Sequence, residues 1–190
     1  MQVCAPVSHL SYFEILFAPS TTPATGFAPG VVTALPEQTE EKAYTAQDSL
    51  RLEIPRLGIN AAVVSVPLAN GIWDVSWLAD QIGWLDGTAF PTLGGNSVLT
   101  AHVYDSNGLP GPFVNLDQMR VGDRIIVHAF DEAFVYEVRL IQQVKPDAIK
   151  SILKHEQTPW ITLVTCRGYD EATDSYRYRV VVRAVQVEIR

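Results

Sequence analysis

Three side chains that lie far apart in the sequence have the chemistry of an acyl-transfer enzyme. Cys166 ends the strand-like run Thr162-Leu163-Val164-Thr165-Cys166, Arg179 follows it by thirteen positions, and His102 ends the segment Leu99-Thr100-Ala101-His102. In such an enzyme a thiol acts as the nucleophile, an imidazole as the acid and base, and a fixed cation stabilises negative charge. No second cysteine lies in the part of the chain that we expect to fold, so Cys166 is the one candidate nucleophile there.

Spacing alone leaves the choice of cation open. Arg177, Arg179 and Arg183 share one face of the expected last strand if side chains alternate regularly. A free thiol has a pKa of about 8.5, and positive neighbours favour its thiolate. Any of these arginines would therefore assist Cys166 if its strand paired beside the strand that carries the thiol.

Composition limits the fold and the partners. A chain of 190 residues with 47% hydrophobic residues is expected to form one domain, with room for a tail. The formal net charge of −7 argues against a nucleic-acid partner, because phosphate binding needs a basic surface. The longest apolar stretch near the start, residues 10–18, is interrupted by Glu14 and is shorter than the roughly 20 residues of a membrane span. A membrane attachment is therefore not visible in the sequence.

The chain divides near residue 48. Residues 1–47 hold five of the twelve prolines and show no sustained hydrophobic period, which predicts an extended or disordered tail. Residues 48–190 are predicted to form the folded domain. The tail contains Cys4, which we expect to be unpaired, with a disulfide to Cys166 as the alternative in an oxidising setting.

Short β-rich runs fill the body of the chain. Short apolar runs bounded by turn residues predict strands at residues 51–54, 61–66, 96–102, 123–130, 134–144, 160–165 and 176–189. Residues 134–140 alternate as in a half-buried strand, whereas residues 160–165 are nearly all apolar, as in a central strand. Pro146 opens the best candidate helix, at residues 146–153, and a shorter helical turn is expected at residues 113–119. Many short strands with one or two short helices favour a mostly β fold closed into a barrel.

The last expected strand changes phase along its length. Its apolar residues fall on even positions up to Ala184 and on odd positions from Val185 onward. A regular strand cannot keep both sets inside, because a slip of one residue exchanges its two faces. We therefore predict a β-bulge near these two residues.

Together, these motifs resemble the sortase family of cell-surface cysteine transpeptidases. The resemblance rests first on TLVTC at residues 162–166, on Arg179 and on His102. It covers residues 50–190, with further matches in LEIPRLGI at 52–59, GW at 83–84, GGN at 94–96, Phe113, Leu116 and Gly122-Asp123. The resemblance also chooses Arg179 among the arginines of the last strand.

Membership of this family would imply a closed eight-stranded barrel and a two-step reaction. Cys166 would attack the threonine carbonyl of an LPxTG-like sorting peptide, His102 would exchange protons with the leaving and incoming amines, and Arg179 would bind substrate and stabilise the oxyanion. Thr165 would help to bind substrate at the oxyanion through its hydroxyl or its backbone. The implied partners are sorting-signal peptides and an amine acceptor on the cell wall or on a protein, in an extracytoplasmic location at the cell surface or membrane. We expect no cofactor, and no metal because no carboxylate spacing is typical of a calcium site.

Some features depart from the family pattern. Ala101 stands where the family usually has glycine before the histidine, and residues 1–47 contain no Asp-Pro-aromatic tripeptide of the kind that forms a lid in some pilin-polymerising sortases. Thr22-Pro23-Ala24-Thr25-Gly26 matches a sorting signal except at its first position. We favour chance in a Pro/Thr-rich segment as its explanation over docking of the tail as a pseudosubstrate.

Two alternatives to a sortase remain open at this level. The first is another cysteine acyl-transfer enzyme or protease on a β-scaffold, such as an L,D-transpeptidase. Such an enzyme usually carries its arginine two residues after the cysteine, whereas Arg167 follows Cys166 directly. The second is a non-catalytic β-barrel binding module in which Cys166 is a buried, unreactive side chain.

Overall fold

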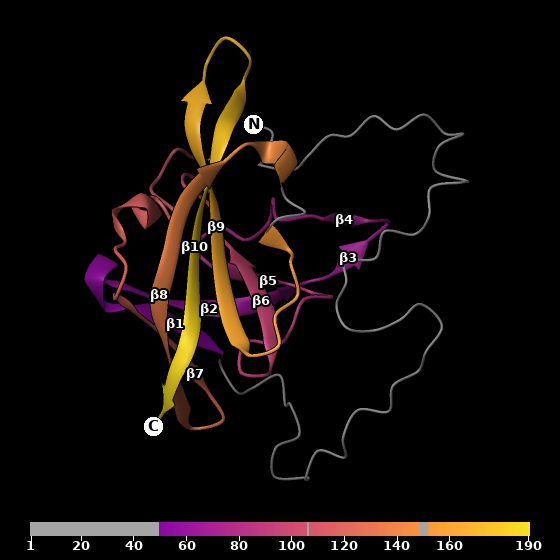
Figure 1. The fold of residues 1–190 in the computed structure, drawn as a ribbon. Helices are drawn as coiled ribbons and strands as arrows, with labels where there is room; N and C mark the ends of the chain where they lie inside the picture. Colours follow the sequence, from indigo (N-terminus) through magenta and orange to yellow (C-terminus); the bar gives the residue numbers. More distant parts are fainter. Residues whose placement is uncertain (1–49, 106, 149–151) are drawn as a thin grey trace.

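A closed β-barrel forms the body of the protein (Figure 1). The structure is a computed structural model that describes residues 50–105, 107–148 and 152–190. Eight strands close the barrel in the order β1-β2-β5-β6-β9-β10-β8-β7, and β3 and β4 form a separate two-stranded sheet. The strands are β1 (Arg51–Ile54), β2 (Ile59–Val66), β3 (Leu68–Ala69), β4 (Ile72–Trp73), β5 (Ile82–Leu85), β6 (Gly95–Thr100), β7 (Arg124–Ala129), β8 (Glu132–Val144), β9 (Pro159–Asp170) and β10 (Ser175–Ile189). The predicted mostly β, eight-stranded barrel is thus confirmed.

Two parallel strand pairs determine which loops come together. β2 pairs with β5 and β6 pairs with β9 in parallel, whereas the other neighbours in the barrel are antiparallel. Because parallel strands need a crossover connection, β6 and β9 meet although β7 and β8 lie between them in the sequence. The β9–β10 hairpin extends beyond the barrel wall, at the top of Figure 1.

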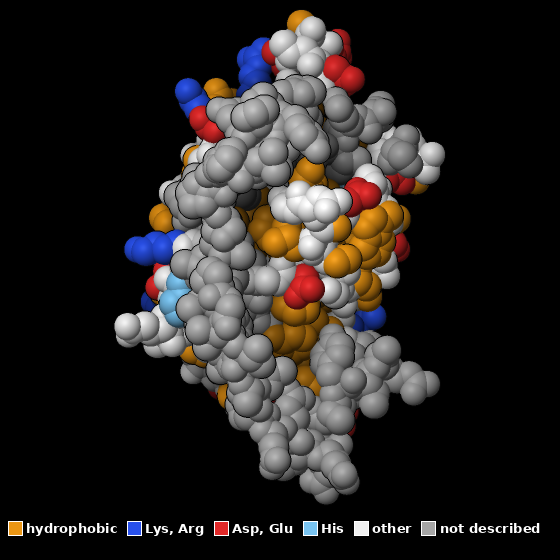
Figure 2. All heavy atoms as spheres, turned by 90° about the vertical axis from the view of Figure 1, so that its right-hand side faces the viewer, with side chains coloured by type: hydrophobic (Ala, Val, Ile, Leu, Met, Phe, Trp, Pro, Cys, Tyr) orange, Lys and Arg blue, Asp and Glu red, His pale blue; other side chains and the backbone are white. Residues whose placement is uncertain are grey.

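Apolar side chains pack on both faces of the sheet around β9 and β10. Alternating residues such as Leu163 and Val180 belong to the cluster that fills the barrel. The intervening residues, including Val164 and Val181, form a second cluster on the outer face. Leu78, from the β4–β5 connection, is fully buried in this outer cluster. Figure 2 shows hydrophobic side chains gathered on the face of the molecule where β3 and β4 lie.

Three short 3₁₀ turns lie among the described residues. They are η2 (Pro55–Leu57), η3 (Leu116–Gln118) and η4 (Pro146–Ala148). The turn η3 lies within predicted helix 113–119, and η4 begins predicted helix 146–153, where residues 149–151 lie outside the described residues. The proline fixes φ at the start of η4, and Ile152, the first described residue after the gap, is again helical, so the helix at residues 146–153 stays a prediction.

The bulge predicted in the last strand is confirmed. The register of β10 against β8 shifts between Arg183 and Ala184, and again between Gln186 and Glu188. The odd-numbered Val187 and Ile189 are nevertheless exposed, so the bulge does not bring the second apolar set into the core. No helix among the described residues is long and apolar enough to cross a membrane.

Candidate active site

Strand register brings the predicted nucleophile and cation together. In the β9–β10 ladder Cys166 and Arg179 are direct partners, in a register that runs from Ser175–Asp170 to Val185–Trp160. Side chains of directly opposed residues lie on the same face of an antiparallel pair. Cys166 is buried, and Arg179 is partly buried. The thirteen-residue spacing in the sequence therefore corresponds to one cross-strand pair.

His102 reaches the same end of β9 from the parallel strand on its other side. Each residue of β6 faces the β9 residue 64 positions further on, from Gly95–Pro159 to Thr100–Val164. His102 follows the last β6 residue by two positions, and the same offset brings it level with Cys166. Its predicted strand ended at residue 102, whereas β6 ends at Thr100. The imidazole is therefore carried by the first residues of a loop.

The arginines around Cys166 differ in their ion pairs. Arg167 pairs with Asp117 at 2.7 Å, and Arg177 pairs with Asp170 at 2.8 Å. Arg183 lies on the same face of β10 as Arg177 and Arg179, and it pairs with Glu156 at 2.6 Å. Among the described residues, Arg179 forms no ion pair. Its guanidinium is therefore the one near Cys166 whose charge the described carboxylates leave available for a substrate.

Backbone carbonyls hold the Arg179 guanidinium. Its Nη1 donates to the Tyr178 carbonyl at 3.0 Å and to the Tyr176 carbonyl at 3.4 Å. Burial lowers the pKa of Arg179 from its ordinary value, because desolvation disfavours the charged form. An arginine stays protonated at neutral pH despite such a shift. The site thus contains a permanent cation with donors that are not committed to a carboxylate.

Thr165 lies on the opposite face of β9 from Cys166. It is buried, and its hydroxyl donates to the carbonyl of Ala101 at 2.9 Å. Ala101 directly precedes His102, so this hydrogen bond joins the end of β9 to the loop that carries the imidazole. The contact gives the Thr165 hydroxyl a structural partner, and the role of Thr165 in binding substrate stays a prediction.

The imidazole of His102 bonds to the segment between β4 and β5. Its Nε2 lies 2.9 Å from the carbonyl oxygen of Val75. On the other side, Gly111 packs so closely that an added Cβ would lie 2.4 Å from the His102 carbonyl oxygen. Neither contact could be predicted from the sequence. A backbone carbonyl has no signature in the residue pattern, and nothing in the sequence singles out Gly111.

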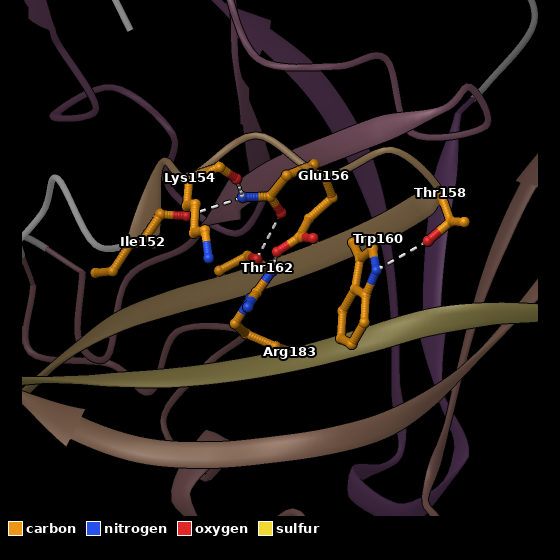
Figure 3. A network of polar contacts seen from close by, with 8 residues as sticks. Ile152, Lys154, Glu156, Thr158, Trp160, Thr162 and Arg183 are labelled. Atoms are coloured by element: carbon orange, nitrogen blue, oxygen red, sulfur yellow. Dashed lines mark hydrogen bonds and ion pairs between the residues drawn. The ribbon is translucent and has the colours of Figure 1, made fainter. Parts of the chain in front are cut away.

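A polar network holds the segment that leads into β9 against the outer face of the sheet (Figure 3). Buried Asn96 donates from Nδ2 to the carbonyls of Ile152 and Lys154, at 2.8 and 3.0 Å. Its Oδ1 accepts a hydrogen bond of 2.6 Å from the Thr162 hydroxyl. The network fixes Ile152 within the outer apolar cluster that also contains Val164, two residues before Cys166.

Arg183 belongs to this network. Its guanidinium donates to Glu156 at 2.6 Å and lies 4.8 Å from the centre of the Trp160 ring, a cation–π arrangement. Arginines on a strand face are usually solvated, but only 15% of this side chain is exposed. Arg183 thus helps to hold the segment before β9 in place through Glu156. It is therefore no longer a candidate for the catalytic cation.

Two cavities formed by described residues lie away from this site. One of about 560 Å³ is polar and is lined by β1, β7 and the C-terminal Arg190. The other, of about 330 Å³, lies between residues 57–61 and 110–115. Cys166, His102 and Arg179 line neither cavity, so the assignment of the site depends on register and side-chain chemistry.

Comparison with known proteins identifies the family. Residues 52–187 match the family model described as the sortase domain. Sortase C-1 from Actinomyces oris is similar in structure, with 29% identity, a TM-score of 0.60 and 73% of each chain covered. Sortase A from Corynebacterium diphtheriae has 26% identity and a TM-score of 0.61, over 74% of this chain and 61% of that one. Sortase C from Streptococcus pneumoniae has 25% identity and a TM-score of 0.61, over 76% and 71%.

This chain belongs to the sortase family, and it is a cysteine transpeptidase of the cell-surface type. The match covers most of the described barrel, including the strands that carry the candidate residues. The comparison with curated protein sequences gave no significant match. The assignment to the family therefore comes from the domain model and from the solved structures.

Proposed function

We propose that Cys166, His102 and Arg179 are the catalytic residues with which this sortase cleaves an LPxTG-like sorting signal. The observation that carries the proposal is the direct pairing of Cys166 with Arg179, the arginine that no described carboxylate neutralises. The position of His102 at the end of β6, the strand beside β9, supports it further.

The reaction divides into two steps. In the first, the Cys166 thiolate attacks the threonine carbonyl carbon of the signal, and the carbonyl π electrons move onto oxygen. The oxyanion lies beside the Arg179 guanidinium, whose charge stabilises it. The bond between threonine and glycine then breaks as protonated His102 gives its proton to the leaving amine, which leaves a thioester on Cys166.

The second step transfers the acyl group. An incoming amine attacks the thioester carbonyl and loses a proton to His102, which restores the imidazolium. Collapse of the oxyanion expels the Cys166 thiolate and forms a new amide. When water takes the place of the amine, the same step yields a free carboxylate. The acceptor amine of this chain belongs to a cell-wall component or to a second protein, and the enzyme acts outside the cytoplasm.

Fluorogenic peptides with an LPxTG core test the proposal. In the presence of a reductant, we expect cleavage by the wild-type chain and a faster release of product when an amine acceptor is added. Cys166→Ala should abolish cleavage, and His102→Ala should reduce it strongly while circular dichroism and thermal unfolding remain like those of the wild type. Near-full activity of His102→Ala would refute the acid/base assignment.

A thiol-labelling experiment separates the enzyme from a non-catalytic barrel. In protein kept reduced, an activated thiolate should react with a mild alkylating reagent at neutral pH faster than the same thiol in the reduced, denatured chain. Cys166→Ala should remove that fast phase. If Cys166 in the folded protein reacts more slowly than in the denatured chain, Cys166 behaves as a buried structural residue, and the catalytic proposal fails.

A further inference from the structure

The hydrogen bond between His102 and Val75 determines which ring nitrogen is free for chemistry. A backbone carbonyl can only accept, so His102 Nε2 must carry the hydrogen in the 2.9 Å contact with the Val75 oxygen. The imidazolium and the neutral Nε2–H tautomer both satisfy this contact. The proton that is gained and lost during the reaction is therefore the one on Nδ1.

Val75 lies in an irregular turn. It follows β4 and precedes β5, and its carbonyl also accepts a hydrogen bond of 3.3 Å from the backbone N–H of Leu78. Leu78 is fully buried in the outer apolar cluster, which anchors the far end of the turn. Upstream, Trp73 Nε1 donates to the Asp86 carbonyl at 2.9 Å. Both flanks of the turn are thus attached to the barrel.

The side chain of Asp74 closes the turn around Val75. Its Oδ1 accepts hydrogen bonds from the backbone N–H of Ser76 at 2.9 Å and from the Ser76 hydroxyl at 2.6 Å. This arrangement is an Asx turn, in which an aspartate side chain fixes the backbone two residues further on. The bonds from Ser76, the hydroxyl first, hold the pKa of Asp74 below its ordinary value. Asp74 is therefore a charged acceptor at neutral pH.

We propose that Asp74 is a positioning residue for His102, because it holds the Val75 carbonyl in line with Nε2 and so leaves Nδ1 to carry the catalytic proton. The inference rests on the proposed role of His102. Asp74 is exposed, and its described hydrogen bonds are those from Ser76, so its influence on the reaction passes through the turn. A carboxylate on the surface thereby contributes to the orientation of the imidazole.

Kinetics of Asp74 variants test this role. Asp74→Ala removes the acceptor that closes the turn, and we expect kcat to fall roughly five- to tenfold, the equivalent of one lost hydrogen bond, with little change in KM. Asp74→Asn keeps an Oδ1 acceptor and should restore kcat to within about twofold of the wild type. Asp86→Ala is the matched control. It also removes one exposed carboxylate that bonds a nearby backbone N–H, that of Gly87, and should turn over like the wild type.

Nitrogen-15 NMR of labelled histidine tests the same point without any substrate. In the neutral ring of His102 we expect a protonated Nε2 and an unprotonated Nδ1, and in Asp74→Ala a mixture of the two tautomers. Wild-type kcat in Asp74→Ala, or a neutral ring that carries its hydrogen on Nδ1, would overturn the inference. If the wild-type chain cleaves no peptide, the proposed function fails, and the NMR result still decides whether Asp74 positions the ring.

Discussion

Spacing does not distinguish Arg179 from Arg177 and Arg183, but the ion pairs in the structure do. Arg167, Arg177 and Arg183 each face a carboxylate at 2.6–2.8 Å, whereas the described donors of Arg179 reach only backbone carbonyls. A cation that is already paired has little charge to offer to a developing oxyanion. Arg179 therefore differs from the neighbouring arginines in that no described carboxylate neutralises its charge.

Substitution of Arg179 tests this distinction. Arg179→Ala should reduce kcat/KM by roughly 100-fold or more, the usual effect of losing one donor to an oxyanion. Arg177→Ala is the matched control, because it removes an arginine two positions away whose guanidinium already pairs with Asp170. Peptide cleavage by both variants can be compared directly. An equal loss in the two variants would mean that general positive charge, and not Arg179 itself, is required.

Residue types and spacing were enough to predict the thiol, the imidazole and the cation. They did not indicate the hydrogen bonds and backbone contacts that position these groups. Cys166 is unique in the body of the chain, and the thirteen-residue spacing to Arg179 matches a short hairpin. The Val75 carbonyl is a backbone group, so no residue pattern indicates it. The hydrogen bond from the Thr165 hydroxyl to the Ala101 carbonyl joins residues 64 positions apart, so the residue pattern could not indicate it.

Gly111 holds the loop after β6 close to His102. Its backbone N–H donates to the Val103 carbonyl at 2.8 Å, and the N–H of buried Phe113 donates to the His102 carbonyl at 3.2 Å. The loop therefore folds back tightly over His102, and the space beside Gly111 is too small for a side chain.

Gly111→Ala should displace the His102 backbone, because the new Cβ would lie 2.4 Å from a carbonyl oxygen that cannot swing aside. We expect a clear loss of kcat in the peptide assay. Gly94→Ala is the control, since its added Cβ would meet only the Gln157 carbonyl oxygen, at an ordinary 3.6 Å. Wild-type kcat in Gly111→Ala would show that the loop can shift without affecting the imidazole.

The segment before β9 depends on Asn96. Asn96→Ala removes three hydrogen bonds at a buried position, and we expect a loss of about 2–3 kcal/mol in the free energy of unfolding. Because Ile152 would no longer be fixed beside Val164, KM for the peptide should rise as well. Denaturant unfolding and peptide kinetics measure the two effects. Asn115→Ala is the control, since that exposed amide accepts one side-chain hydrogen bond, from Gln118. Equal stability of the two variants would contradict the importance of the network.

Most strands could be predicted from alternation, and the exceptions have physical causes. β5 was missed because four residues that pair in parallel with β2 are too few to show a period. β9 was predicted to end at residue 165 but continues to Asp170, since pairing with β10 extends it where apolar residues are absent. Of the helical turn expected at residues 113–119, only the 3₁₀ turn η3 (Leu116–Gln118) is helical in the structure.

At the scale of the whole molecule, the barrel brings together groups that are distant in the sequence. The loop after β6, the end of β9 and the start of β10 meet because β9 pairs with both other strands. A closed barrel follows from the number of short strands, whereas their order does not. The two crossovers that leave β2 beside β5 and β6 beside β9 have no local signal in the sequence, and the resemblance to the family supplied that information.

The division near residue 48 stays a prediction, because Cys4 and the TPATG segment at residues 22–26 lie outside the described residues. We expect deletion of residues 1–47 to leave the thermal unfolding transition and the cleavage of LPxTG peptides unchanged. The described core begins at Leu50, and its strands pair with one another. A marked rise in activity after the deletion would favour docking of the tail as a pseudosubstrate.

The central claim is that Cys166 forms a covalent acyl intermediate. Intact-mass spectrometry of the reduced protein, quenched in acid during turnover of an LPxTG-type peptide, measures this directly. We predict a species heavier by the acyl portion that ends at threonine, located on Cys166 by digestion, absent from Cys166→Ala and lost when an amine is added. Cleavage of the peptide with no adduct under any quench time, or an adduct that survives in Cys166→Ala, would contradict the account.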